Sequence, residues 1–175
     1  IAEQHPELDI VLLSRQTPGA MMGEKARARL HAWLDRLGVQ VRAGVEIVKV
    51  MPDGVAVDNG QVVEAQAILW TTGVRVSPIA AAAGLEVDDR GRIVTDHALR
   101  SVTHPNIYAV GDAAAIRQGY GVIHGTCQSG IPTGVHAAAS IDRELKGKQP
   151  KKFRFGYIHQ PVSLGRADGV IQFTH

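Results

Sequence analysis

The amino-acid sequence predicts an α/β fold built around parallel strands. A short continuous apolar run at residues 8–15 is typical of a strand buried on both faces of a parallel sheet. Apolar residues then recur every three or four positions over residues 23–37, which predicts an amphipathic helix that Gly38 is expected to end. A second strand is expected over residues 39–42. Strand, helix and strand together predict a parallel crossover, which is right-handed in nearly all known cases.

The rest of the chain continues as short strands and helices. The pair Asn59-Gly60 predicts a type I′ hairpin turn, because both residues tolerate positive φ. Pro132 and Gly134 fall in the first turns of the last expected helix. Strands are expected over residues 46–50, 54–58, 61–64, 67–70, 91–94 and 107–110, and helices over 78–83 and 126–145.

Composition narrows the class of protein. The 175 residues are 45% hydrophobic and 21% charged, which is typical of a globular protein with a real core. A net charge of +2 and 5% aromatic residues give no indication of a nucleic-acid partner. The sequence contains neither a secretory signal nor an apolar run of about 20 residues. The single cysteine, Cys127, excludes an internal disulfide and is compatible with the reducing cytoplasm, where we expect the protein.

The ends of the sequence suggest a piece of a longer polypeptide. The chain starts at Ile1 without Met and stops at His175, in what we interpret as the middle of a strand. We therefore expect that further motifs lie outside it.

The strongest chemical signature is the segment Asn106-Ile107-Tyr108-Ala109-Val110-Gly111-Asp112-Ala113-Ala114. An expected strand delivers Gly111-Asp112 to a turn, where a carboxylate can accept hydrogen bonds from ribityl or ribose hydroxyls. Gly111 permits close backbone approach, and the amide of Ala113 can face a phosphate. Taken alone, Gly-Asp could simply cap a helix after a strand.

The wider stretch over residues 91–112 resembles the second flavin motif of the pyridine nucleotide–disulfide reductase superfamily. The resemblance implies a Rossmann-like fold with two dinucleotide domains, for FAD and NAD(P), incomplete in this chain. It implies that residues 1–74 are the second part of the NAD(P) domain and 75–150 the second part of the FAD domain. Residues 151–175 would then start a C-terminal α+β region. In this family the Asp of the motif, here Asp112, contacts the ribityl–phosphate region of FAD.

The segment from Trp70 to Arg75 resembles the end of the family's NAD(P) domain. A Trp-x-x-Gly-Val pattern is similar to that of type II NADH dehydrogenases. The resemblance places Thr72 and Gly73 near the nicotinamide dinucleotide. The glycine-rich turn of that domain would precede Ile1.

The end of the first strand bears on the choice of nicotinamide cofactor. In NAD-specific relatives an acidic residue usually ends this strand, but here Ser14 is followed by Arg15. Arg15 is expected near the adenosine ribose, where a guanidinium allows a 2′-phosphate, so NADH and NADPH both stay open. An exposed arginine at a strand end is the alternative reading.

The segment from Thr126 to Gly134 resembles the start of the helix that, in type II NADH dehydrogenases, points its N-terminus at the flavin. Reduced flavin carries negative charge there, which a helix N-terminus stabilises. Cys127, Gln128 and Ser129 are expected at the flavin edge, with Gln128 matching the family's first Gln. Pro132 and Thr133 stand in place of the family's second Gln pair, which leaves a quinone acceptor open.

The resemblance implies an enzyme, a flavoprotein oxidoreductase that passes a hydride from NAD(P)H to FAD and electrons on to an acceptor, expected to be quinone-like. A disulfide or coenzyme A-disulfide reductase and a ferredoxin or rubredoxin reductase are alternatives, and so is a fragment without catalytic competence. Cys127 lacks the second cysteine that a redox pair needs. No catalytic acid or base and no metal site are expected.

The sequence says less about assembly and surroundings. The basic run over residues 146–152 is most simply a solvated helix end and linker, with contact to a membrane surface as the alternative. Peripheral association with the inner face of the membrane and assembly as a homodimer both stay open.

Overall fold

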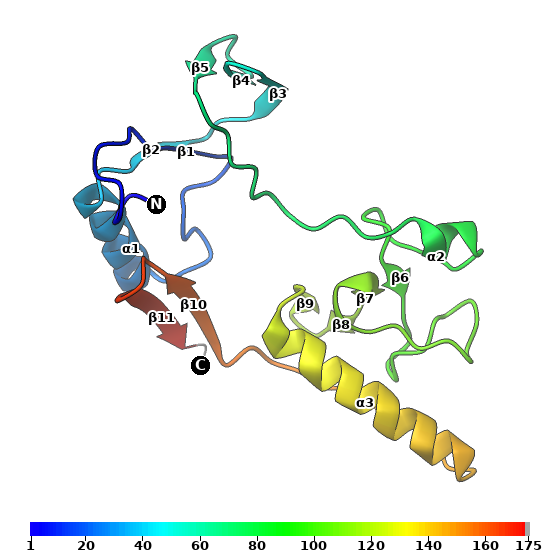
Figure 1. The fold of residues 1–175 in the computed structure, drawn as a ribbon. Helices are drawn as coiled ribbons and strands as arrows, with labels where there is room; N and C mark the ends of the chain where they lie inside the picture. Colours follow the sequence, from blue (N-terminus) through cyan, green and yellow to red (C-terminus); the bar gives the residue numbers. More distant parts are fainter. Residues whose placement is uncertain (174–175) are drawn as a thin grey trace. The chain divides into compact units, whose positions relative to one another are not determined.

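The computed structural model describes residues 1–173 and divides the chain into two compact units (Figure 1). Unit 1 comprises Ile1–Thr71 and Ile158–His175, and unit 2 comprises Thr72–Tyr157. The final strand of the chain is described as far as Phe173, and the expected continuation into Thr174 and His175 lies outside the described residues. The assignment of chain segments to particular cofactor domains stays a prediction.

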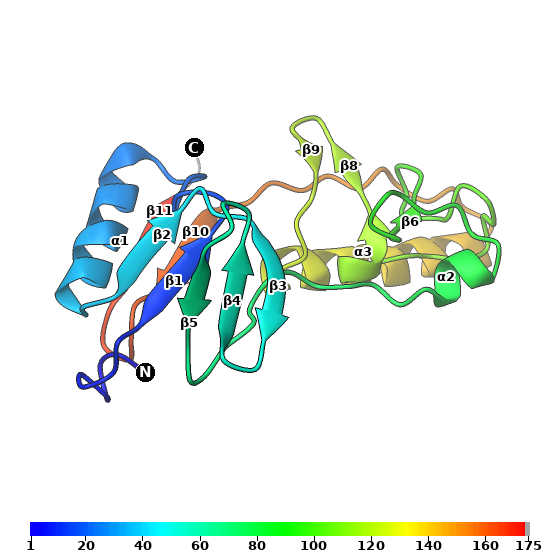
Figure 2. The ribbon, with the colours of Figure 1, turned by 90° about the horizontal axis from the view of Figure 1, so that it is seen from above.

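Unit 1 contains the expected strand–helix–strand crossover (Figure 2). Strand β1 (Val11–Ser14) pairs in parallel with β2 (Gln40–Ala43), and helix α1 (Glu24–Arg36) connects them. Gly38 follows the helix with φ +68°, the left-handed conformation that commonly ends helices. The expected full burial of β1 is wrong, because its residues are half-buried. Its sheet has two strands among the described residues, too few to cover both edges of β1.

The apolar face of α1 packs against the end of the chain. Strands β10 (His159–Ser163) and β11 (Gly169–Phe173) form an antiparallel hairpin, from which Leu164 and Val170 join Met22 and Leu30 in one buried cluster. The amide of Gly23, the residue that caps α1, donates to the side-chain oxygen of Gln172 in β11. Residues 158–173 are therefore part of the core of unit 1.

A three-stranded antiparallel sheet follows β2. It consists of β3 (Ile47–Met51), β4 (Gly54–Val57) and β5 (Val62–Glu64), in that order. The expected type I′ turn is wrong: Gly60 has φ +82°, whereas the only non-glycine residue with positive φ among residues 1–173 is Leu99. Gly60 donates to the carbonyl of Val57, so one left-handed residue suffices to close a longer loop.

The strand expected over residues 67–70 does not form. This segment is irregular, with Leu69 76% and Trp70 55% exposed. A strand buried on both faces needs neighbours for its backbone groups. No strand among the described residues pairs with this segment, so its apolar side chains stay at the surface.

Unit 2 is built from short elements and one long helix. Helix α2 (Ile79–Ala82) ends before Gly84, at φ +77°, as expected. Helix α3 (Cys127–Leu145) matches the expected long helix and runs through Pro132 without a break. The strands are β6 (Ile93–Val94), β7 (Ala114–Ala115), β8 (Arg117–Gln118) and β9 (Gly121–Val122).

The strand expected over residues 107–110 is also wrong. Tyr108 forms an isolated bridge with Arg100, and the parallel ladder forms four residues later, between β6 and β7. Ala109 is buried in the core, whereas Val110 is 36% exposed. A continuous ladder requires a partner strand along the whole segment, and the loop around Arg100 offers only one bridge. The hydroxyl of Tyr108 instead donates to Glu144 Oε2 in α3, at 2.9 Å.

A tight turn supports the core of unit 2. The carboxylate of Asp96 accepts hydrogen bonds from the amides of Ala98 and Arg100, at 2.7 and 3.0 Å, and from the guanidinium of Arg100. Burial alone would raise the pKa of Asp96, but these hydrogen bonds outweigh it, so that its pKa is lowered. The turn holds Leu99, with φ +75°, fully buried against Ile116 and Phe153.

Candidate functional site

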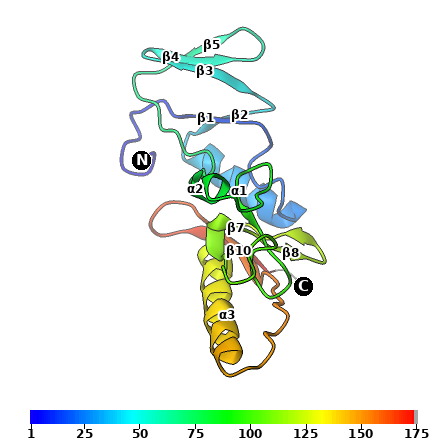
Figure 3. The same cartoon turned by 90° about the vertical axis from the view of Figure 1, so that its right-hand side faces the viewer.

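The expected flavin turn is a single turn of 3-10 helix, η1 (Gly111–Ala113), which leads directly into β7. Gly111 has φ +59°, in the left-handed region that favours glycine. Its amide donates to the hydroxyl of Thr133 in α3, at 3.1 Å. This hydrogen bond joins the turn to α3, the long helix labelled in Figure 3.

Thr133 is a residue whose role the sequence did not reveal. Its side chain is fully buried, and its hydroxyl accepts from Gly111 while donating to the carbonyl of Gly130, at 2.7 Å. Both capacities of the hydroxyl are therefore used. The sequence marked Thr133 only as a departure from a glutamine pattern, since its partner lies 22 residues away.

Asp112 lies exposed in the turn, with its carboxylate directly against the backbone of Gly125. A Cβ atom at Gly125 would overlap Asp112 Oδ1, so a glycine is required there for this placement. The Asp112 side chain is exposed, so solvent reaches this carboxylate. Its oxygens therefore remain open to hydroxyl donors from a ligand. Gly125 carried no signal in the sequence, because glycines before helices have many roles.

The N-terminus of α3 is held by a capping box. The amide of Thr126 donates to Ser129 Oγ, at 3.1 Å, and that hydroxyl donates to the carbonyl of His124, at 2.7 Å. Ser129 is 1% exposed, so its side chain closes the loop before the helix. Cys127 is exposed and Gln128 half-buried in the same first turn.

The loop that precedes α3 is fixed a second time by Tyr157. The amide of His124 donates to the Tyr157 hydroxyl and this hydroxyl donates to the His124 carbonyl, both at 2.6 Å. The rings of these two residues lie 6.1 Å apart. Gly125 is thereby held beside Asp112 from both of its neighbours in the chain. The exposed carboxylate of Asp112, the backbone of Gly125 and the N-terminus of α3 therefore lie next to one another.

The remaining expected positions lie elsewhere. Thr72 and Gly73 are exposed at the start of unit 2, and Gly73 has φ +68° with open space where a Cβ would be. Arg15, in unit 1, forms an exposed ion pair with Glu46, at 2.8 Å. A hollow of about 350 Å³ opens at the end of β1, and Ser14, but not Arg15, is among the residues that line it.

Residues 1–173 contain neither a cluster of metal-ligating side chains nor a candidate membrane-spanning helix. No group of three or more metal-ligating side chains comes together in this part of the chain. In the same residues, no helix has both the length and the apolar character needed to cross a bilayer.

Comparison with known proteins identifies the family. Residues 7–140 match the family described as pyridine nucleotide-disulphide oxidoreductase. The chain belongs to this family. The resemblance found in the sequence is thereby confirmed. The expected FAD/NAD(P)-binding fold class is confirmed as well, and the chain contains part of that fold. FAD and NAD(P)H are the cofactors expected of an oxidoreductase of this family.

Two relatives in Mycobacterium tuberculosis are similar in sequence. An NADH dehydrogenase-like protein is 30% identical over 155 residues, which are 87% of this chain and 38% of the relative. A type II NADH:quinone oxidoreductase is 31% identical over 140 residues, 75% of this chain and 28% of the relative. The matched residues thus span between 28% and 38% of the length of these two relatives. Among solved structures, an NAD-dependent persulfide reductase from A. fulgidus shares the fold, with a TM-score of 0.71 and 18% identity over 91% of this chain and 30% of that one.

Proposed function

We propose that this chain forms part of a flavoprotein that takes a hydride from NAD(P)H onto FAD and passes electrons to a quinone-like acceptor. The observation that carries the proposal is the open carboxylate of Asp112, held against Gly125 beside the N-terminus of α3. The family match and the NADH dehydrogenase-like relatives support the reaction class.

The residues of the turn fit an FAD molecule. Asp112 would accept hydrogen bonds from ribityl or ribose hydroxyls, for which its oxygens are open. The amide of Ala113 would face the pyrophosphate, and Gly111 allows the backbone to come close. The first turn of α3, with Cys127 and Gln128, would place its partial positive charge at the flavin edge. When bound, FAD supplies the redox chemistry, while these residues bind and orient it.

The choice between NADH and NADPH would depend on the end of β1. Ser14 lines the hollow there, and its hydroxyl donates to the carbonyl of Gln16, at 2.6 Å. Arg15 could meet a 2′-phosphate only by exchanging its ion pair with Glu46. This pairing favours NADH in our proposal, with Thr72 and Gly73 near the dinucleotide.

The residues of this chain constrain the identity of the electron acceptor less than they constrain the cofactors. The relative named as a quinone oxidoreductase favours a quinone, and a membrane-dissolved quinone would in turn call for peripheral membrane association. A sulfur acceptor is the second candidate, since a persulfide reductase has a similar fold. A dithiol mechanism within these 175 residues is disfavoured, because Cys127 is the only cysteine.

The test is a visible spectrum of the purified protein followed by steady-state assays. We expect bound flavin that absorbs at about 450 nm, and oxidation of NADH that a water-soluble quinone accelerates more than a disulfide does. Acceleration by the disulfide alone would replace quinone by a sulfur acceptor. A colourless protein that gains no flavin from added FAD would mean that this chain is not competent by itself.

A further inference from the structure

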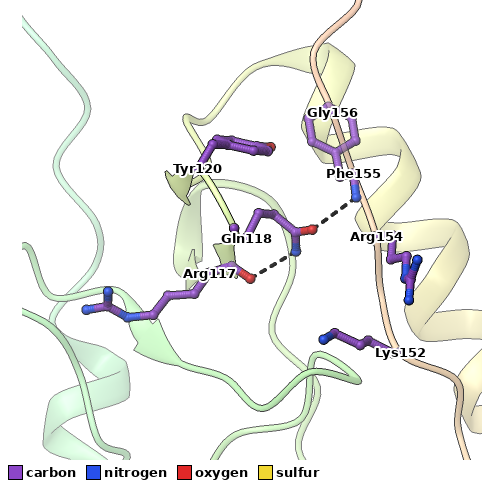
Figure 4. A pocket seen from close by; sticks show the side chains of 8 residues that line it. Arg117, Gln118, Tyr120, Lys152, Arg154, Phe155 and Gly156 are labelled. Atoms are coloured by element: carbon purple, nitrogen blue, oxygen red, sulfur yellow. Dashed lines mark hydrogen bonds between the residues drawn. The ribbon is translucent and has the colours of Figure 1, made fainter.

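A second hollow lies in unit 2, between the β8–β9 hairpin and the extended segment over residues 152–156 (Figure 4). Its volume is about 520 Å³, within the range of small-molecule sites. None of the residues expected to contact FAD or NAD(P) lines it. The side chains that concern the argument are Arg117, Gln118, Tyr120, Lys152, Arg154 and Phe155.

The two walls of this hollow are fixed to each other. Gln118 donates from its side-chain amide to the carbonyl of Arg117, at 2.9 Å, and its side-chain oxygen accepts from the amide of Phe155, at 3.1 Å. The ring of Phe155 stacks on Phe153, with centroids 6.3 Å apart and planes 5° from parallel, and Phe153 is a buried core residue. The hollow is therefore supported by the core of unit 2.

Three residues with cationic side chains are among those that line this hollow. In Figure 4, Arg117 extends from the hairpin, and Lys152 and Arg154 extend from the opposite segment. No carboxylate lines the hollow, and none of the three cations forms an ion pair with any residue of the part described, 1–173. Three other basic residues of unit 2, Arg92, Arg100 and Lys146, each contact a carboxylate. The hollow thus concentrates positive charge that an anion would neutralise.

An aromatic ring completes the lining. Tyr120 is 56% exposed, and its ring meets Tyr157 edge-on at 6.4 Å, which supports it from one side. An exposed, supported ring beside cations suits a planar ligand with a charged tail. Guanidinium and ammonium groups recognise phosphate oxygens through charge-assisted hydrogen bonds.

We propose that this hollow binds a nucleoside phosphate, with the phosphates between Arg117, Lys152 and Arg154 and the base against Tyr120. The site is separate from the flavin turn and does not depend on the proposed function. It also gives part of the basic run at residues 146–152 a role other than solvation: Lys152 lines the site, whereas Lys148 does not.

Calorimetric titration of the purified chain with ADP tests the proposal. We expect saturable binding that Lys152→Gln weakens by about tenfold and that the matched change Lys148→Gln leaves unaltered. Both lysines are exposed, so neither change should affect folding. Tyr120→Ala should weaken ADP but leave inorganic pyrophosphate unchanged. Amide NMR should place the ADP-induced shifts at Gln118 and Gly119.

Four outcomes would overturn the site. Absence of saturable ADP binding removes it. Equal weakening by Lys152→Gln and Lys148→Gln would mean a diffuse positive field rather than a pocket. Shifts confined to Gly111–Ala113 would place the nucleotide at the flavin turn. Pyrophosphate binding as tight as that of ADP, with Tyr120→Ala without effect, would refute recognition of the base.

Discussion

Gly125 and Asp112 illustrate how a site depends on the absence of an atom. The carboxylate occupies the space that any side chain at position 125 would fill. Asp112 can be recognised in the sequence because it follows an apolar run and a glycine. Gly125 cannot, since its requirement arises from contact with a residue on another part of the chain.

Gly125→Ala should displace the Asp112 carboxylate and weaken FAD binding by about tenfold or more, equivalent to ~1.4 kcal/mol. Flavin fluorescence quenching during titration with the protein measures the affinity. Gly134→Ala is the matched control, because a Cβ there meets nothing within 4 Å. Unchanged affinity in Gly125→Ala would show that Asp112 does not hold FAD.

Thr133→Val should lower the free energy of unfolding by about 1–3 kcal/mol, because it removes the acceptor for the Gly111 amide and the donor to Gly130 at constant side-chain volume. Urea denaturation measures this loss. Thr133→Ser keeps the hydroxyl and should retain most of the stability. If Ser and Val destabilise equally, packing of the methyl group, and not the hydrogen bonds, joins the turn to α3.

At the scale of elements, a helix or strand was predicted correctly where interactions between neighbouring residues stabilise it. Helices α1 and α3 formed where periodicity predicted them, since their backbone hydrogen bonds are internal. The strands expected over residues 67–70 and 107–110 failed, since a strand needs a partner that its own sequence does not specify. The pair Asn59-Gly60 correctly predicted where the chain turns, but the turn is not of type I′.

The turn from Asp96 to Arg100 should make the protein acid-sensitive. The pKa of Asp96 is lowered from its ordinary value of 3.8: burial acts against this, and the amides of Arg100 and Ala98 with the Arg100 guanidinium outweigh it. A lowered folded pKa means that the stabilisation is complete above pH 3.8 and is lost as the pH falls through the lower, folded value.

Asp96→Asn should therefore reduce the loss of stability that acid causes below about pH 4, while lowering stability at neutral pH. Thermal unfolding followed by circular dichroism from pH 2 to pH 7, roughly spanning both titrations, measures both effects. Asp89→Asn is the control, because Asp89 is exposed and its side chain accepts no hydrogen bond within residues 1–173. Identical acid profiles for Asp96→Asn and the wild type would contradict the assignment.

For the whole molecule, the informative finding is that residues 158–173 belong with the first 71 residues. The sequence suggested that the C-terminal segment starts a further region. In the structure, Leu164 and Val170 share a buried cluster with Leu30 of α1. Unit 1 therefore gains part of its core from the opposite end of the chain.

Leu164→Ala should destabilise unit 1 by about 2–5 kcal/mol, because it leaves a cavity in this cluster. Hydrogen exchange should become faster in α1 and stay unchanged in α3, since α3 belongs to unit 2. Ile171→Ala is the matched control on the same hairpin, where Ile171 is 59% exposed. Equal acceleration in α1 and α3 would show that the two units unfold as one.

The sequence by itself determined the family, the two main helices, the crossover and the position of Gly111 and Asp112. These depend on periodicity and on short motifs, which neighbouring residues specify. Only the tertiary structure decided that Gly125 and Thr133 complete the turn, and that Lys152 and Arg117 line the same hollow. Such features arise where distant segments come into contact, and the space and hydrogen bonds available there follow from packing.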